Sequence, residues 1–232
     1  MIFNAQHLQY LIINPNTTQA VTTRLLNAAE TLAKPQQSVH AVTAAFGAPY
    51  ISTEVAYAVA GHAVLDAFDS FNAAAGSNGS RGYPKSVLIG CFGDPGLFAL
   101  RERAEGRTAV TGLAEASFHA AAQHGNFAIV TAGAKWQAML ERLALALGFA
   151  SKLQSIHTLE VDGAAIAALH ATNPPAATAL LRTACLQAAT PGVQAIILGG
   201  AGLAGYAAAF AHELPVPLID SVDAGVRALL AA

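Results

Sequence analysis

The feature that most constrains the fold is a set of short apolar runs, each ending in a loop rich in glycine or asparagine. Four are clear, at Leu8–Ile13, Val87–Ile89, Phe127–Thr131 and Ala195–Leu198. Runs of this length and composition are typical of strands that are buried on both faces, as in parallel sheets. Helical patterns separate them, and strands that alternate with helices imply crossover connections and an α/β fold.

The remaining elements are predicted from periodicity and from turn residues. Weaker strands are expected at Ser38–Ala44, Leu153–Leu159 and Val216–Ile219. The segment Ala73–Pro84, rich in Gly, Ser and Asn, is predicted to be an exposed linker. Helices are expected at Gln19–Lys34, Thr53–Phe71, Val110–Gly125, Lys135–Leu147, Ala164–Ala171, Ala176–Thr190, Leu203–His212 and Val222–Leu230.

The clear strands and their loops occur twice, in the same order. YLIINPNT (10–17) is similar to FAIVTAGA (127–134), and VLIGCFG (87–93) is similar to AIILGGAG (195–202). Any parallel strand followed by glycine gives some likeness of this kind, but the shared order favours a duplicated α/β unit. We therefore predict two similar parallel-sheet halves, residues 1–110 plus 215–232 and residues 111–214, related by a pseudo-two-fold axis. Ligands of parallel sheets bind beyond the carboxyl ends of the strands, so the site is expected in the cleft between the halves.

The stretch Ser86–Arg101, SVLIGCFGDPGLFALR, combines a strand, a thiol and a helix start. Asp94 and Pro95 suit the N-cap and first position of a helix. Unpaired N–H groups at a helix N-terminus can lower the pKa of a nearby thiol, which would make Cys91 reactive. The alternative is that Cys91 is a small buried apolar residue, which is the usual role of a lone cysteine.

Composition excludes several classes of function. The chain is 54% hydrophobic and only 11% charged, with a net charge of −2, which argues against disorder and against nucleic-acid binding. No run is long enough to span a membrane, and MIFNAQHLQY lacks the regions of a signal peptide, so we expect a cytoplasmic protein that does not bind membranes. No histidine or cysteine cluster has metal-ligand spacing, and no nucleotide-binding motif is present, so neither a metal nor a cofactor is expected. A weakly charged, alanine-rich surface favours a homo-oligomer.

Four segments, in order, resemble the aspartate/glutamate/hydantoin racemase superfamily, with hydantoin and allantoin racemases as the most similar branch. They are INPNTT, GCFGDPGLFALRE, TGLAEASFHAA and ILGGAGLAG. The resemblance implies two flavodoxin-like halves and cofactor-independent proton transfer at a carbon next to a carbonyl. In the family, one cysteine from each half flanks that carbon. Cys91 matches the first of these cysteines, whereas Gly200 occupies the position of the second.

The resemblance also implies which residues hold the substrate. Asn14 would bind a carbonyl or carboxylate, although a turn or cap role is the alternative. Backbone N–H groups of Phe92 and Gly93 in one half, and of Gly200 and Ala201 in the other, would stabilise an enolate. Thr131 ends the strand equivalent to the first one, so its hydroxyl is expected to face the cleft.

Four other residues were weighed for a part in the chemistry. Glu115 and His119 share a helix face and could support the site as an acid/base pair, although a structural contact is the more common role. Cys185 lies within a helical pattern and is expected in the core. Asp220 could reach the site or cap the last helix.

The sequence thus predicts a racemase that uses Cys91 on a small carbonyl compound such as a hydantoin, allantoin or an amino-acid derivative. Because Gly200 removes the second thiol, two alternatives stay open. One is a one-cysteine decarboxylase or other lyase resembling arylmalonate decarboxylase, although that enzyme retains the thiol of the second half. The other is a small-molecule binding relative without catalysis.

Overall fold

The structure, a computed structural model, describes residues 8–77 and 83–232 and contains two four-stranded sheets. The first has the order β2-β1-β3-β4 and the second the order β6-β5-β7-β8, and all their strand pairs are parallel. The repeated order confirms the duplication, since β1 corresponds to β5 and β3 to β7. The strands are β1 (Leu8–Asn14), β2 (Gln37–Thr43), β3 (Ser86–Ile89), β4 (Ala109–Gly112), β5 (Phe127–Ala132), β6 (Leu153–Leu159), β7 (Ala195–Gly199) and β8 (Leu218–Asp220).

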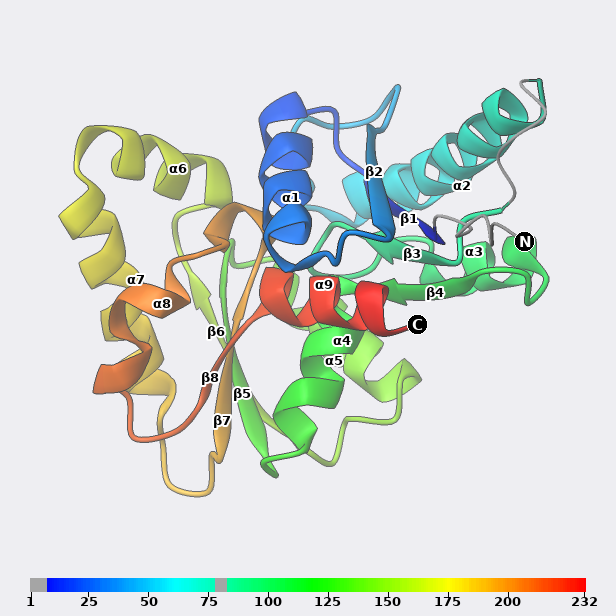
Figure 1. Cartoon of the computed structure of the whole chain (residues 1–232). Coiled ribbons are helices and arrows are strands. Elements are labelled where there is room, and N and C mark those ends of the chain that lie inside the picture. Colours follow the sequence, from blue (N-terminus) through cyan, green and yellow to red (C-terminus); the bar gives the residue numbers. More distant parts are fainter. Residues whose placement is uncertain (1–7, 78–82) are drawn as a thin grey trace.

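Helices cover both sheets, as expected of an α/β fold (Figure 1). They are α1 (Gln19–Leu32), α2 (Glu54–Ser77), α3 (Leu97–Ala104), α4 (Leu113–Ala122), α5 (Trp136–Ala146), α6 (Gly163–Thr172), α7 (Pro174–Ala188), α8 (Ala207–Phe210) and α9 (Ser221–Ala231). None of these described helices has the length and hydropathy that a bilayer-spanning segment requires.

The two halves exchange one helix each. Helix α4 follows β4 of the first sheet but packs on β7 of the second, whereas α9 follows β8 of the second sheet and packs on β3 and β4. The two helices lie side by side between the sheets (Figure 1). One large apolar cluster therefore runs through both halves, from Ile12 and Leu88 to Phe127 and Val226.

Strand β8 corrects the division of the chain expected from sequence, which placed α4 in the second half and all of the C-terminal residues in the first. Residues 218–220 were assigned to the first half together with the C-terminal helix. They pair instead with β7, so they belong to the second sheet, and only α9 returns to the first. Asp220 caps α9, accepting hydrogen bonds from the N–H groups of Val222 (2.8 Å) and Asp223 (3.3 Å).

Three element predictions were wrong. Residues 109–112 form the short strand β4 rather than the start of a helix, because they pair with Ser86–Ile89. Helix α2 continues to Ser77, into the segment predicted as a linker. The helix expected at Leu203–His212 is broken, because Gly205 has a φ of 85° and only Ala207–Phe210 is α-helical. Residues 1–7 and 78–82, which include most of the segment MIFNAQHLQY and part of the predicted linker, lie outside the described residues.

Candidate active site

A cavity of about 290 Å³ lies where the carboxyl ends of the two sheets meet. The loops after β1, β3 and β7 contribute to its lining, and β5 contributes its last two residues, Thr131 and Ala132, so all four predicted strand ends meet there. Asn16 and Thr18 come from the first of these loops, Cys91 and Phe92 from the second, and residues 199–203 from the last. Residues that are far apart in the chain, and that belong to both halves, therefore face one space.

Cys91 is the one cysteine that lines this cavity in the described part of the chain. The residue is buried, with 8% of its surface exposed, and follows the buried strand β3. Burial raises the pKa of its thiol well above the ordinary value, and the nearby Asp94 carboxylate raises it further. The expectation of a lowered pKa was wrong, because burial of the thiol dominates, and α3 begins only at Leu97, six residues after Cys91. Cys91 is therefore a thiol, rather than a thiolate, in the free protein at neutral pH.

The first loop presents Asn16, not Asn14, to the cavity. Asn14 is fully buried, and its Nδ2 donates to Thr22 Oγ1 (3.0 Å) and to the Thr18 carbonyl (3.1 Å). It therefore has the turn role that was the alternative in the sequence analysis. Asn16 Oδ1 accepts from the Thr18 N–H (2.9 Å), which leaves its Nδ2 group to face a ligand.

Of the backbone N–H groups expected to hold an enolate, two are already engaged. The Gly200 N–H donates to Ser221 Oγ (3.0 Å), and the Gly93 N–H donates to the Asp94 carboxylate. Gly93 also lies outside the cavity lining, where it contacts Trp136. Phe92 and Ala201 do line the cavity, and within the described part of the chain neither N–H donates a hydrogen bond. One donor from each half therefore remains available to an oxyanion.

Two further residues named from the sequence lie on the cavity lining. Thr131 lines the cavity, and its Oγ1 donates to the Gly199 carbonyl (2.7 Å), so it ties β5 to the loop after β7. Gly200 also lines the cavity and has a φ of 145°, which L-residues with a side chain rarely adopt. Cys185 lies in the core of the second half, where burial raises its pKa to about 12.

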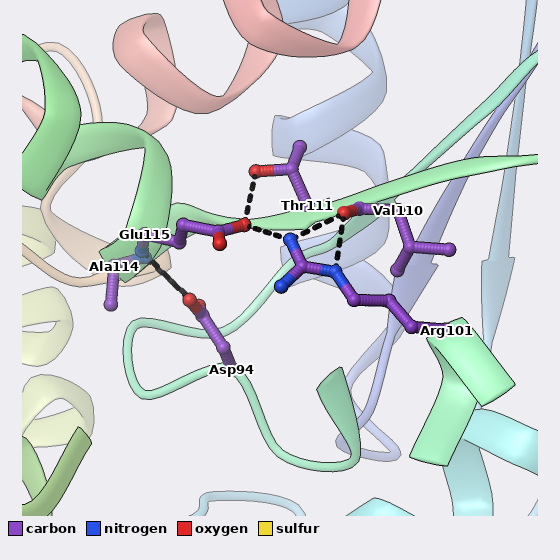
Figure 2. A network of polar contacts seen from close by, with 6 residues as sticks. All are labelled: Asp94, Arg101, Val110, Thr111, Ala114 and Glu115. Carbon is purple, nitrogen blue, oxygen red and sulfur yellow. Dashed lines mark hydrogen bonds and ion pairs between the residues drawn. The ribbon is translucent and has the colours of Figure 1, made fainter. Parts of the chain in front are cut away.

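A polar network behind the cavity fixes the loop that carries Cys91 (Figure 2). Asp94 is buried and accepts from the N–H groups of Ala114 (2.9 Å) and Glu115 (2.8 Å), so it caps α4 rather than its own helix. The Glu115 carboxylate contacts Arg101 and Thr111, and Arg101 also donates to the Val110 carbonyl. The network thereby joins the Cys91 loop to α3, β4 and α4.

The proposed Glu115–His119 pair does not form an acid/base pair at the cavity. Neither residue belongs to the lining. Glu115 is committed to the network, and the exposed His119 ring packs edge-on against Phe149, with 4.9 Å between the ring centroids. Among residues 8–77 and 83–232, no group of three or more His, Cys, Asp or Glu side chains could hold a metal ion.

Comparison with known proteins agrees with this geometry. The family described as Asp/Glu/Hydantoin racemase matches residues 11–229, nearly the whole chain. The chain belongs to this family.

Two relatives show where in the family the chain lies. A hydantoin racemase of Paenarthrobacter aurescens is 29% identical over 221 residues, which are 95% of this chain and 89% of that protein. The structure of an allantoin racemase from Klebsiella pneumoniae has a TM-score of 0.81 and 31% identity, covering 97% of this chain and 86% of that one. A liganded variant of arylmalonate decarboxylase, at 18% identity and a TM-score of 0.66 over 97% of this chain and 93% of that one, shares the fold.

For a member of a racemase family, the cavity contains three notable side chains that the sequence analysis did not select. Arg24 of α1 donates to the Gly202 carbonyl (3.1 Å) across the two halves. Tyr50, in the loop after β2, and Trp136, at the start of α5, lie on the same cavity. Arg24 and Trp136 lie within helices, and the loop after β2 is not one of the four strand ends from which the sequence analysis predicted the site.

Proposed function

We propose that this chain is a cofactor-independent racemase in which Cys91 moves a proton at a carbon next to a carbonyl. The observation that carries the proposal is the position of Cys91 on a cavity between the duplicated halves of a racemase-family fold. In the reaction, the Cys91 thiolate takes the carbon-bound proton, and the electron pair of that C–H bond passes to the carbonyl oxygen as an enolate. Return of a proton to the opposite face of the carbon inverts it.

The enolate has donors in this cavity. The N–H groups of Phe92 and Ala201 come from opposite halves, and Asn16 Nδ2 is a third donor on the same lining. Fixed N–H donors at a developing oxyanion stabilise it strongly where water is excluded. They offset the high pKa of the substrate carbon, which otherwise makes its deprotonation slow.

The lining supports a neutral substrate with an apolar substituent. Alanine, glycine and other apolar residues dominate it, and within the described chain Arg24 is its one charged side chain. No carboxylate is available there for an ammonium group, which disfavours free amino acids. The polar ureido group of allantoin would leave hydrogen bonds unmade. A 5-substituted hydantoin with an alkyl or aryl substituent fits best, with the imide oxygen that gains charge directed to the N–H donors.

A one-cysteine lyase is the second candidate, and the lack of a side chain at Gly200 favours it. In that reaction the bond to a carboxylate breaks, CO2 leaves, and the electron pair remains on the carbon until the Cys91 thiol protonates it. A malonate carries two negative charges, however, and Arg24 is the single cation on the described lining.

A homo-oligomeric state, a cytoplasmic location and the absence of nucleic-acid partners stay predictions from the sequence.

The test is the optical rotation of each enantiomer of 5-benzylhydantoin, 5-isobutylhydantoin, allantoin and phenylalanine, incubated with the protein. We expect both apolar hydantoins to racemise, and Cys91→Ala to lower the rate by about 100-fold or more. Cys185→Ala is the matched control, because Cys185 is buried in the core of the second half, outside the cavity lining.

The outcomes separate the candidates. Racemisation that Cys91→Ala leaves unchanged would refute the role of this thiol. Release of CO2 from phenylmalonate, without racemisation of any hydantoin, would favour the lyase. Binding of hydantoins without turnover would leave the non-catalytic relative.

A further inference from the structure

Inversion by proton transfer requires groups on two faces of the reacting carbon, and the second half offers none at Gly200. The backbone there has a φ of 145°, and a Cβ at this position would contact Leu203. The loop has therefore adopted a conformation suited to glycine, and a second proton donor, if it exists, comes from elsewhere on the cavity. This inference rests on the proposed racemase function.

Few side chains of the described lining can exchange a proton with carbon. Arg24 stays protonated in proteins, and the amide of Asn16 does not act as an acid. The hydroxyls of Thr18 and Thr131 each donate to a carbonyl at 2.7 Å. Apart from Cys91, this leaves Tyr50 as the one titratable acid on the lining that the structure describes.

Tyr50 belongs to the first half of the chain, but its hydroxyl forms its hydrogen bonds with residues of the second half. The Gly163 N–H, at the start of α6, donates to the Tyr50 oxygen at 3.0 Å. The hydroxyl faces the Ala132 carbonyl at 3.4 Å, a long contact from which its proton can turn away at little cost. Ala132 and Gly163 line the same cavity as Gly200 and Cys91, so residues of the second half hold the phenol at this cavity.

The surroundings of Tyr50 suit a group that gains and loses a proton. Burial raises the pKa of its phenol, while the hydrogen bonds from Gly163 and from the Trp136 side chain lower it. Charge on Asp162, and to a smaller extent on Cys91, also raises it. The thiol and the phenol line the same cavity. The pKa of the phenol stays above its ordinary value, and the Gly163 N–H offsets part of the cost of a phenolate, as a donor does in an oxyanion site.

We propose that Tyr50 is the acid/base group on the second face of the substrate, in the place of the missing cysteine. When the Cys91 thiolate has taken the proton of one enantiomer, the Tyr50 O–H bond breaks and its proton forms the new C–H bond. The electron pair of the enolate goes to that bond, and the phenolate remains between Gly163 and Trp136. Transfer of the thiol proton to the phenolate through water restores the starting state, and the other enantiomer reacts by the same steps in reverse.

The experiment follows each pure enantiomer of 5-benzylhydantoin in D2O by NMR of the carbon-bound proton and by optical rotation. We expect Tyr50→Phe, which keeps the ring, to lower racemisation by about 100-fold or more. It should still exchange the proton of the enantiomer that faces Cys91, without inversion. Cys91→Ala should show the opposite selectivity, with slow proton exchange of the other enantiomer alone and no inversion.

Tyr206→Phe is the control, because Tyr206 is a partly buried tyrosine that packs on His170 (5.2 Å) outside the cavity lining. It should leave racemisation unchanged. A second variant replaces Tyr50 with a fluorinated tyrosine, which keeps the shape but makes the phenol more acidic. The limb of the pH–rate profile set by Tyr50 should then move to lower pH, a shift that a merely structural role would not produce.

Three results would overturn the proposal. Undiminished racemisation by Tyr50→Phe would do so while the racemase function stands. So would loss of exchange for both enantiomers in Tyr50→Phe, since that would indicate a role in binding. Exchange of one enantiomer without inversion in the unmodified protein would show that no second group acts. No exchange by the unmodified protein, in contrast, would refute the proposed function itself.

Discussion

At the scale of single residues, the proposed chemistry depends on how the fold changes the pKa of one thiol, that of Cys91. Cys91 lies at the end of a buried strand, where burial and the Asp94 carboxylate both keep it protonated. The reactive thiolate therefore forms only as the pH rises, unless a bound substrate displaces water and supplies compensating contacts. The sequence placed the thiol correctly but not its acidity, because burial is a property of the folded chain.

The first prediction from this concerns pH. In the Cys185→Ala background, the rate of alkylation of Cys91 by iodoacetamide should keep rising above about pH 9, whereas an ordinary thiol of pKa about 8.5 would approach its plateau there. The sign follows from the raised pKa, because a group that ionises later supplies less thiolate at each lower pH. Mass spectrometry of the Cys91 peptide measures the rate, and a plateau at or below neutral pH would contradict the account.

The motif INPN shows what sequence can and cannot settle at this scale. Two identical side chains, Asn14 and Asn16, follow the same strand, and the pattern alone selected the wrong one. Asn14 is the last residue of β1 and turns inward to Thr22 of α1. The choice between them depends on the direction of the chain as it leaves the strand, which side-chain type does not encode.

At the scale of elements, Asp94 couples the Cys91 loop to α4. Its carboxyl group is buried, and although backbone N–H donors lower its pKa, burial dominates and raises the pKa to about 7. The sequence correctly identified Asp94 as a helix cap but assigned it to the wrong helix. The Asp94 carboxylate fits against Gly112, just before α4, where a Cβ would clash with it. Only the fold brings these two residues together, so the sequence pattern did not indicate this contact.

This pKa predicts a pH dependence of stability. The native state keeps the Asp94 proton until about pH 7, whereas the unfolded chain releases it near the ordinary value of about 3.9. Between these values the native state binds more protons, so the contribution of Asp94 to the free energy of unfolding falls as the pH rises. Asp94→Asn cannot ionise and should lose less stability from about pH 5 to about pH 8 than the unmodified protein.

Urea unfolding at the two pH values measures the difference. Asp69→Asn is the control, because Asp69 is exposed and its ion pair with Arg103 is a surface contact. Equal pH dependence in Asp94→Asn and the unmodified protein would show that Asp94 does not titrate in this range.

The short strand β4 marks the limit of sequence prediction for elements. Its residues, AVTG, precede a strong helical pattern, and only Val110 and Gly112 are buried. Pairing with β3 decides their conformation, which is a contact between segments and not a local preference.

At the scale of the whole molecule, the duplication was predictable because similar strands and loops occur twice in the chain, in the same order. The repeated order of strands and loops placed the cavity correctly, at the carboxyl ends of both sheets. The division predicted from sequence already placed α4 in the second half and α9 in the first, but it did not foresee that β8 pairs with the second sheet, because pairing between strands is a contact that only the fold creates. The exchange of α4 and α9 joins the halves through one shared core and so fixes the distance across the cavity.

The central claim is that Cys91 transfers the substrate proton across this cavity. The most direct measurement is the rate at which one enantiomer of 5-benzylhydantoin is inverted by the unmodified protein and by Cys91→Ser, which nearly keeps the size of the side chain but not its acidity. The account predicts inversion by the unmodified protein and a loss of about 100-fold or more in the variant. Inversion by Cys91→Ser at the unmodified rate would contradict it.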